Sequence, residues 1–174
     1  MLSLLVPFGL GLVADQATKA WARTLAVGTD EVVLIDGWLS FVHAQNTGAA
    51  FSTLPGFRWL FLGFTAIAVV VLVSLAWAQP PTARAVPAVL GTILGGAIGN
   101  AIDRLRLGHV TDFIQVSMGH EGLADTMIRW AGTRVWPIFN IADIALVVGV
   151  TLFAAWFVFE DDPTDSASDP APAD

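Results

Sequence analysis

The stretch 94-LGGAIGNAIDRLRLGHVTDFI-114 begins as an apolar, glycine-rich run and ends among polar side chains. Its first part carries no charge, whereas Asp103, Arg104, Arg106, His109 and Asp112 follow in close succession. The free energy of burying such groups depends on whether the surrounding solvent is water or lipid. The fold therefore depends on which solvent surrounds the apolar half of this stretch.

The composition indicates a membrane protein. The chain has 174 residues, of which 55% are hydrophobic and 13% charged, with a mean hydropathy of +0.69. A soluble domain carries about 25% charged residues. Segments 59–78 and 85–102 contain no charge, and 138–159 contains only Asp143. Each is close to the roughly 20 residues that cross a bilayer as a helix, so three spans are predicted.

The N-terminal segment 1–14 is apolar but would be only about 21 Å long as a helix. A cleaved signal peptide is one alternative, but its positive n-region is missing, because the first cation is Lys19. We therefore expect a first spanning helix that carries Asp15 and Lys19 at its outer end. The predicted fold is an all-α membrane protein, one domain over 1–159, with four transmembrane helices at about 1–22, 59–78, 85–105 and 138–159.

Charge and cysteine content exclude several classes of function. The chain has no cysteine, so disulfide and thiol chemistry are excluded. The net charge is −7, and segment 160–174 holds six of the fifteen acids and no base. This composition predicts a disordered acidic tail. The remainder is nearly neutral, which argues against a nucleic-acid partner.

A small β-element is predicted between the first two helices. The β-branched run 32–35 is followed by Asp36-Gly37 and then by the second run 38–43. Asp-Gly favours the primed turn that matches the twist of two antiparallel strands. We expect this hairpin at the membrane surface.

A second loop follows Asp112, where another extended piece is expected. Within 115–136, four apolar residues recur at helical spacing. An amphipathic helix lying on the membrane interface fits this pattern, and a plain loop fits it almost as well. The four residues are Leu123, Met127, Trp130 and Ala131.

Glycines and charges of the third predicted helix indicate close packing. Gly91, Gly95 and Gly99 recur every four residues, and such small-residue stripes let helix backbones approach closely in lipid. Asn100 and Arg104 also share a face. Asp103 next to Arg104 could neutralise it, and Asp15 with Lys19 has the i, i+4 spacing of an ion pair. Taken alone, these polar groups favour a structural role.

Asp112 and Asp143 lie at the adjoining ends of the third and fourth helices, at the same depth. When two carboxyl groups share one site, the repulsion between their charges keeps one protonated and one ionised. Such a pair suits hydrolysis, since one member takes a proton from water while the other donates one. A proton- or ion-conducting site and purely structural carboxylates remain alternatives at this point.

A metal site is a weaker hypothesis. His109 lies three residues before Asp112, but no HExxH-type helix accompanies the two residues. His109 is better interpreted as a polar residue of a turn. We therefore expect neither a metal nor a cofactor.

Four motifs together resemble the ordered motif set of the lipoprotein signal peptidase (signal peptidase II) family, which are membrane aspartyl peptidases. They are DQATK at 15–19, NTGAAFS at 46–52, GGAIGNAIDRLRLGHVTDF at 95–113 and FNIAD at 139–143. Each motif is weak alone, but the ordered set is specific. It covers essentially 1–159 and leaves the tail outside.

The resemblance implies an aspartyl endopeptidase of the bacterial cytoplasmic membrane. Such enzymes cut the signal peptide from a prolipoprotein just before a cysteine that carries a diacylglyceryl group. The implied catalytic dyad is Asp112 and Asp143. The implied partners are diacylglyceryl-prolipoproteins and membrane lipids, and the expected state is a monomer.

The motif positions also imply roles for other residues. Asn46 and Asn140 match polar positions that could hold backbone groups of the substrate. Asn100 and Arg104 match positions that orient the bound chain.

Three more matching positions suggest a supporting role. Asp15 and Lys19 would hold the helix ends together, and Asp103 is assigned a structural role. Segment 115–136 is longer than expected for the family and could form a lid over the site.

The charge pattern and the family resemblance predict opposite orientations in the membrane. The side with both termini has Arg84 as its obvious cation, so the positive-inside rule places the termini outside. The family places its active site outside and both termini in the cytoplasm, and we follow the motifs because several outer cations belong to them. The cations of the opposite side are Lys19, Arg23, Arg58, Arg104, Arg106, Arg129 and Arg134.

Two other classes of function are the alternatives. A small membrane transporter or proton channel would use Asp112 and Asp143 as relay carboxylates. A non-enzymatic assembly factor would use the glycine stripe as a surface for a partner helix.

Overall fold

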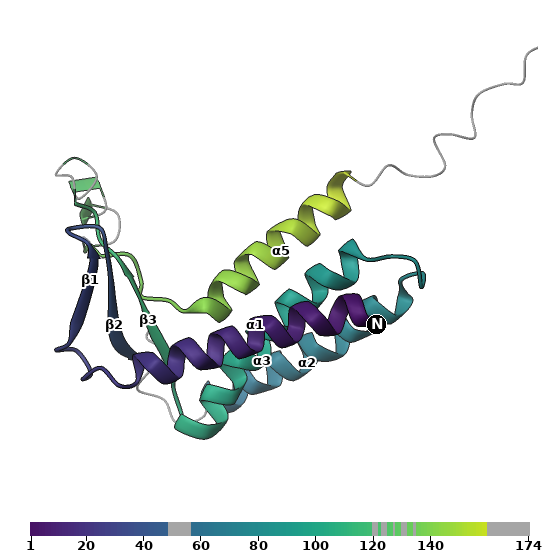
Figure 1. Cartoon of the computed structure of the whole chain (residues 1–174), viewed down its shortest axis with the longest axis horizontal. Coiled ribbons are helices and arrows are strands. Elements are labelled where there is room, and N and C mark those ends of the chain that lie inside the picture. Colours follow the sequence, from purple (N-terminus) through teal and green to yellow (C-terminus); the bar gives the residue numbers. More distant parts are fainter. Residues whose placement is uncertain are drawn as a thin grey trace, which may run out of the picture.

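The architecture is a helical bundle with a small sheet across one end. The computed structural model describes residues 1–48, 57–119 and 135–159, with single positions 122, 125, 126, 128, 129, 132 and 133 between the last two ranges. Figure 1 shows the sheet at the end of the helices that lies opposite the N-terminus. The four long helices of the described chain are α1 (Leu2–Ala22), α2 (Phe57–Ala78), α3 (Ala85–Leu107) and α5 (Ile141–Phe159).

Three of these helices are long and apolar enough to cross a membrane. They are Arg58–Ala78, Ala85–Leu107 and Ile141–Phe159. Helix α1 is 21 residues long but is not among them, and it carries the buried Asp15 and Lys19. A helical membrane-type fold is thus confirmed for the described residues, while the number of spans stays a prediction.

Helix α3 lies at the centre of the bundle and packs against α1, α2 and α5. Its glycines make this possible. A Cβ at Gly91 would collide with the backbone carbonyl of Leu4 in α1, and one at Gly96 with the carbonyl of Ala142 in α5. The helix ends at Gly108, whose φ of 83° is left-handed and favours glycine. The small residues therefore set how closely α1 and α5 approach α3.

The sheet has three antiparallel strands in the order β1-β2-β3. Strands β1 (Glu31–Ile35) and β2 (Leu39–Asn46) form the predicted hairpin, and Gly37 in its turn has a φ of 71°. Strand β3 (Val110–Val116) pairs with β2 and begins two residues after Gly108. Asp112 therefore lies inside a strand, whereas the sequence suggested that the extended piece follows it.

An aromatic cluster joins the sheet to α1. The ring of Trp21 lies edge-on to Phe41 of β2 at 5.4 Å and to Phe113 of β3 at 6.4 Å, and the two phenylalanines are 5.8 Å apart. Such pairs prefer this T-shaped geometry. The cluster fixes β3, and with it Asp112, relative to the end of α1.

Two predictions concern residues outside the described part. The four residues that predicted an amphipathic helix within 115–136 are all among them, and so is the acidic segment 160–174. Both stay predictions.

Candidate active site

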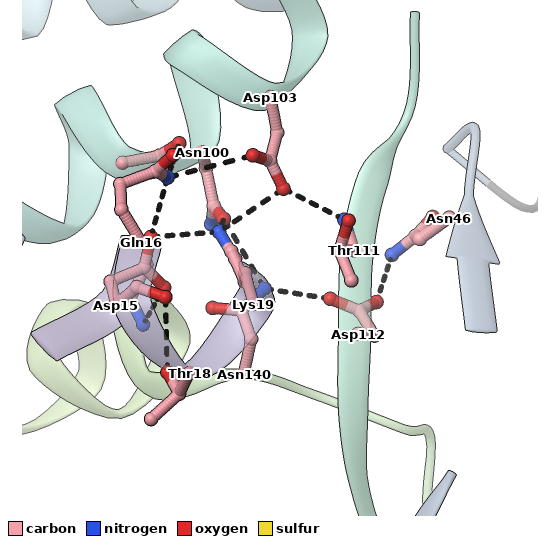
Figure 2. Close-up of polar contacts among 12 residues, drawn as sticks. Asp15, Gln16, Thr18, Lys19, Asn46, Asn100, Asp103, Thr111, Asp112 and Asn140 are labelled. Carbon is pink, nitrogen blue, oxygen red and sulfur yellow. Dashed lines mark hydrogen bonds and ion pairs between the residues drawn. The ribbon is translucent and has the colours of Figure 1, made fainter. Parts of the chain in front are cut away.

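Asp112 is held by amide donors on both of its carboxylate oxygens. It lies within β3 with 2% of its surface exposed. Asn46 of β2 donates its Nδ2 to Oδ2 of Asp112 at 2.9 Å, and Asn140 donates its Nδ2 to Oδ1 at 2.6 Å. Figure 2 shows the two amides on either side of the carboxylate. The carboxylate therefore has one fixed orientation.

Asp143 is fixed by the way α5 begins. The N–H of Asp143 donates to Oδ1 of Asn140 at 3.0 Å, and the N–H of Asn140 donates to Oδ2 of Asp143 at 3.1 Å. This reciprocal pattern is a capping box, in which the cap residue and the third helical residue satisfy each other's N–H groups. The sequence Asn-Ile-Ala-Asp thus places Asp143 in the first turn of α5 and orients its side chain.

Two asparagines connect Asp112 and Asp143. Asn140 donates its Nδ2 to Oδ1 of Asn100 at 3.2 Å as well as to Asp112. Asn100 donates its own Nδ2 to Oδ1 of Asp143 at 2.8 Å. The amides therefore form a continuous bridge from one carboxyl to the other. Strand β3, helix α3 and the start of α5 meet at this bridge.

A buried ion cluster lies behind the bridge. The ammonium of Lys19, whose side chain has 0% exposure, is 3.0 Å from Asp15 and 3.5 Å from Asp103. It also donates to Oδ1 of Asn100 at 2.7 Å. The ion pair predicted from the i, i+4 spacing of Asp15 and Lys19 is present. The ammonium also joins α1 to α3.

By sequence, Asp103 could neutralise its neighbour Arg104, but the ion pairs that Asp103 forms lie elsewhere. Asp103 pairs instead with Lys19 and with Arg23 at 3.4 Å, while the Arg104 guanidinium lies 4.8 Å from the ring centre of Phe61 in α2. Consecutive helical residues point in different directions, so an i, i+1 pair does not meet.

A cleft of about 540 Å³ opens beside the two carboxyls. Asp112, Asp143 and Asn46 form its polar part. Its apolar wall runs along the first turns of α5 and the segment before it. The apolar lining residues are Trp136, Pro137, Ile138, Phe139, Ile144, Val147 and Val148.

The environment of Asp112 makes its carboxyl a weaker acid than usual. Burial raises the pKa of Asp112 to about 6, and the negative charge of Asp143 adds to this effect. Hydrogen bonds from Asn46 and Asn140 and the charge of Lys19 act in the opposite direction. Burial therefore has the largest influence on this carboxyl.

His109 lies between α3 and β3, in the position expected of a polar turn residue. Burial lowers its pKa. Within the described ranges, no group of three or more His, Cys, Asp or Glu residues could hold a metal ion. The hypothesis of a metal pair with Asp112 gains no support from this arrangement.

Sequence reasoning missed two members of the polar cluster. Gln16 donates its Nε2 to Oδ2 of Asp15 at 3.1 Å and to the Gly99 carbonyl at 3.2 Å. Arg23 donates to the hydroxyl of Thr111 at 3.1 Å. Together with Lys19, the two residues have the i, i+3, i+7 spacing of one helix face, along α1 and its C-cap residue Arg23. That spacing is the signal that could have identified them.

Comparisons with known proteins identify the family of the chain. The family model of signal peptidase (SPase) II matches residues 8–159. A lipoprotein signal peptidase of Xanthomonas campestris pv. campestris is 42% identical over 148 residues, which is 80% of each chain. One of Pseudomonas putida is 40% identical over 159 residues, covering 88% of this chain and 82% of the relative.

Solved structures show the same fold. Two structures of a bacterial membrane enzyme, obtained by the in meso method, superpose with TM-scores of 0.68 and 0.67 at 26% and 28% identity. The first covers 97% of this chain and 92% of its own, and the second 90% and 92%. Because the family model spans most of the chain and the relatives exceed 30% identity over most of it, the chain belongs to the signal peptidase II family.

Proposed function

We propose that this protein is an aspartic endopeptidase of the bacterial cytoplasmic membrane that removes the signal peptide from prolipoproteins. The cut falls just before the cysteine that carries a diacylglyceryl group. Family membership supports peptidase activity on lipoprotein precursors. One observation supports the aspartic mechanism above all: Asp112 and Asp143, from different elements, line the same cleft and are linked by two asparagines.

The dyad hydrolyses the peptide by general acid–base catalysis. The ionised carboxyl takes a proton from a water molecule while that water attacks the scissile carbonyl carbon. The protonated carboxyl gives its proton to the carbonyl oxygen, and a tetrahedral diol forms. A proton then passes to the amide nitrogen as the C–N bond breaks, which releases the amine and a carboxylic acid. Because its pKa is raised to about 6, Asp112 can both bind and release a proton at a pH close to that value.

The remaining polar residues hold the substrate and the dyad. Asn46 lines the cleft and has an amide oriented by Asp112, so it is suited to contact the substrate backbone. Arg104 orients the bound chain from α3. Asn100 and Asn140 keep the two carboxyls at their separation, and a substrate-binding role of Asn140 stays a prediction.

The apolar wall of the cleft matches the chemistry of the substrate. Ile144, Val147 and Val148 extend from Asp143 along one face of α5, and all three are partly or largely exposed. A signal helix and acyl chains are themselves apolar. Apolar residues beside the two carboxyls of the cleft suit hydrolysis next to a lipid anchor.

We further propose four spans, with α1 as the first. At 1.5 Å per residue, α1 is roughly 31 Å long, close to the bilayer core. Exposed tryptophans at the helix ends support the same depth in the membrane for α1 and α2, because tryptophan favours the membrane–water interface. Trp21 and Trp59 lie at the end near the site, and Trp77 lies at the other end. In this proposal the site faces the extracytoplasmic side and both termini are cytoplasmic. The single domain over 1–159 acts as a monomer.

The test uses purified protein in nanodiscs and a synthetic prolipoprotein peptide with a diacylglyceryl cysteine. Wild type is compared with Asp112→Asn and Asp143→Asn, and mass spectrometry gives the cut position. Asp30→Asn is the matched control, since Asp30 is exposed and lies outside the cleft lining. Cleavage before the lipidated cysteine that persists in the control and is lost in both folded dyad variants supports the proposal.

Absence of cleavage by folded wild type would contradict it. Proton flux into liposomes would then test the transporter alternative, which family membership does not favour.

A further inference from the structure

The peptide just before Asp112 is held by a buried carboxylate. The N–H of Thr111 donates to Oδ2 of Asp103 at 2.9 Å. Thr111 has 0% and Asp103 1% exposure, so water does not compete for this hydrogen bond. Asp103 lies in α3, and the bond ties β3 to that helix.

The peptide just before Asp143 is held in the same way. The N–H of Ala142 donates to Oδ1 of Asp15 at 3.0 Å, across 127 positions of sequence. Asp15 has 1% and Ala142 0% exposure. This N–H belongs to the first turn of α5, where a helix has no partner of its own to offer. The bond ties α5 to α1.

One ammonium joins the two carboxylates. Lys19 is 3.0 Å from Oδ2 of Asp15 and 3.5 Å from Oδ2 of Asp103. Figure 2 shows Lys19 between these carboxylates and Asn100. The space is also tight, because a Cβ at Gly99 would collide with Oδ2 of Asp15. The three side chains therefore form a single charged unit with little freedom to move.

We propose that Asp15 and Asp103 are positioning residues of the dyad, two arms of one clamp joined by Lys19. Each arm fixes the backbone N–H of the residue that precedes one catalytic aspartate. The clamp thereby sets the distance and mutual orientation of Asp112 and Asp143. This inference rests on the proposed function, since it assigns the dyad the role of catalyst.

The chemistry of the dyad makes such positioning important. Proton transfer and water attack require heavy atoms within hydrogen-bond reach, and a misplacement of about 1 Å costs on the order of 10²-fold in rate. Asn100 and Asn140 link the carboxyl groups themselves, whereas the clamp holds the backbones that carry them. A loose backbone would move the carboxyls even with the amide bridge in place.

The experiment measures kcat and KM for Asp103→Ala, Asp103→Asn, Asp15→Ala and Asp15→Asn, per folded protein, beside wild type. An asparagine oxygen can still accept the backbone N–H, and an alanine cannot. We expect the alanine variants to lose about 100-fold in kcat, with KM changed less than about twofold. The asparagine variants should recover to within about tenfold of wild type.

Asp30 provides the matched control. Its Oδ2 accepts the N–H of Ala26 at 2.8 Å, so Asp30→Ala and Asp30→Asn remove the same kind of hydrogen bond at an exposed site. Their kcat should stay at the wild-type value. Alanine variants of Asp15 or Asp103 that lower the melting temperature but keep kcat would overturn the proposal.

Amide exchange separates failure of the clamp from failure of the proposed function. If wild type cleaves no lipopeptide, the proposed function fails, and hydrogen exchange still tests the clamp. The Thr111 amide should exchange faster in Asp103→Ala, and the Ala142 amide faster in Asp15→Ala. Unchanged exchange at both amides overturns the clamp.

Discussion

Helices α2 and α3 have similar lengths but opposite surroundings. Within their most apolar stretches, 6% of α2 and 61% of α3 are buried inside the protein. Helix α2 consists mainly of large apolar residues with one glycine and one charge, whereas α3 carries four glycines and three charges. Lipid solvates apolar side chains as well as a protein core does, so the interior is left to small and polar residues. Of these two helices, the one that carries the small and polar residues is therefore the more buried.

The largest expected effect comes from adding a side chain to α3. Gly91→Leu would drive its Cβ into the carbonyl of Leu4, a backbone atom that cannot rotate away. We expect α1 and α3 to separate, so that little folded protein is recovered. Gly63→Leu in α2 is the matched change, because nothing lies within 4 Å of a Cβ there. Yield and tryptophan-fluorescence melting in detergent compare them, and an equal loss in both would contradict the contrast.

A smaller but still large effect comes from removing the buried cation. Lys19→Met would leave Asp15 and Asp103 without their shared ammonium, and breaking such a buried pair costs about 3–5 kcal/mol. Arg106→Met, on the exposed face of α3, should change the unfolding free energy by less than about 1 kcal/mol. Chemical unfolding in detergent measures both. Similar losses would show that Lys19 is no more important than a surface cation.

The contrast between local and long-range contacts explains what the sequence could predict. The i, i+4 spacing predicted the pair of Asp15 and Lys19, because a helix brings such residues together without help from the rest of the fold. The Asp36-Gly37 turn predicted the hairpin for the same reason. The uninterrupted apolar run of α2 predicted its span by length and composition alone.

The partners of Asp103 could not be predicted in this way. Its contacts with Lys19 and Arg23 join separate helices, so they depend on how α1 packs on α3. The bond from Ala142 to Asp15 likewise joins residues 127 positions apart. Motif order indicated that Asp112 and Asp143 belong to one site, but the amide bridge between them required the packed structure.

A pH-dependent effect of intermediate size should come from Asp112 in β3, the strand that follows α3, whereas α2 contains no carboxylate. Burial raises the pKa of Asp112 to about 6, above its unfolded value, so the folded state binds the proton more tightly. Its stabilising contribution is fully present below about pH 4 and is lost as the pH rises through 6.

Melting of wild type and Asp112→Asn from pH 4 to 8 measures this contribution. Wild type should lose about 2–3 kcal/mol relative to the variant across the window. Parallel curves would show that Asp112 does not titrate there.

The smallest expected effect concerns the one end of α2 that meets polar groups. Arg104 lies 4.8 Å from the centre of the Phe61 ring, and a cation over an aromatic face is worth about 0.5–2 kcal/mol. Phe61→Leu should therefore lower the unfolding free energy by about 1 kcal/mol and raise KM, because Arg104 loses the surface that holds it. Phe64 is one helical turn away and 58% exposed, so Phe64→Leu should change neither value. If the two variants behave alike, the contact between Phe61 and Arg104 contributes nothing measurable. Helix α2 would then differ from α3 along its whole length, because it would contribute only apolar surface.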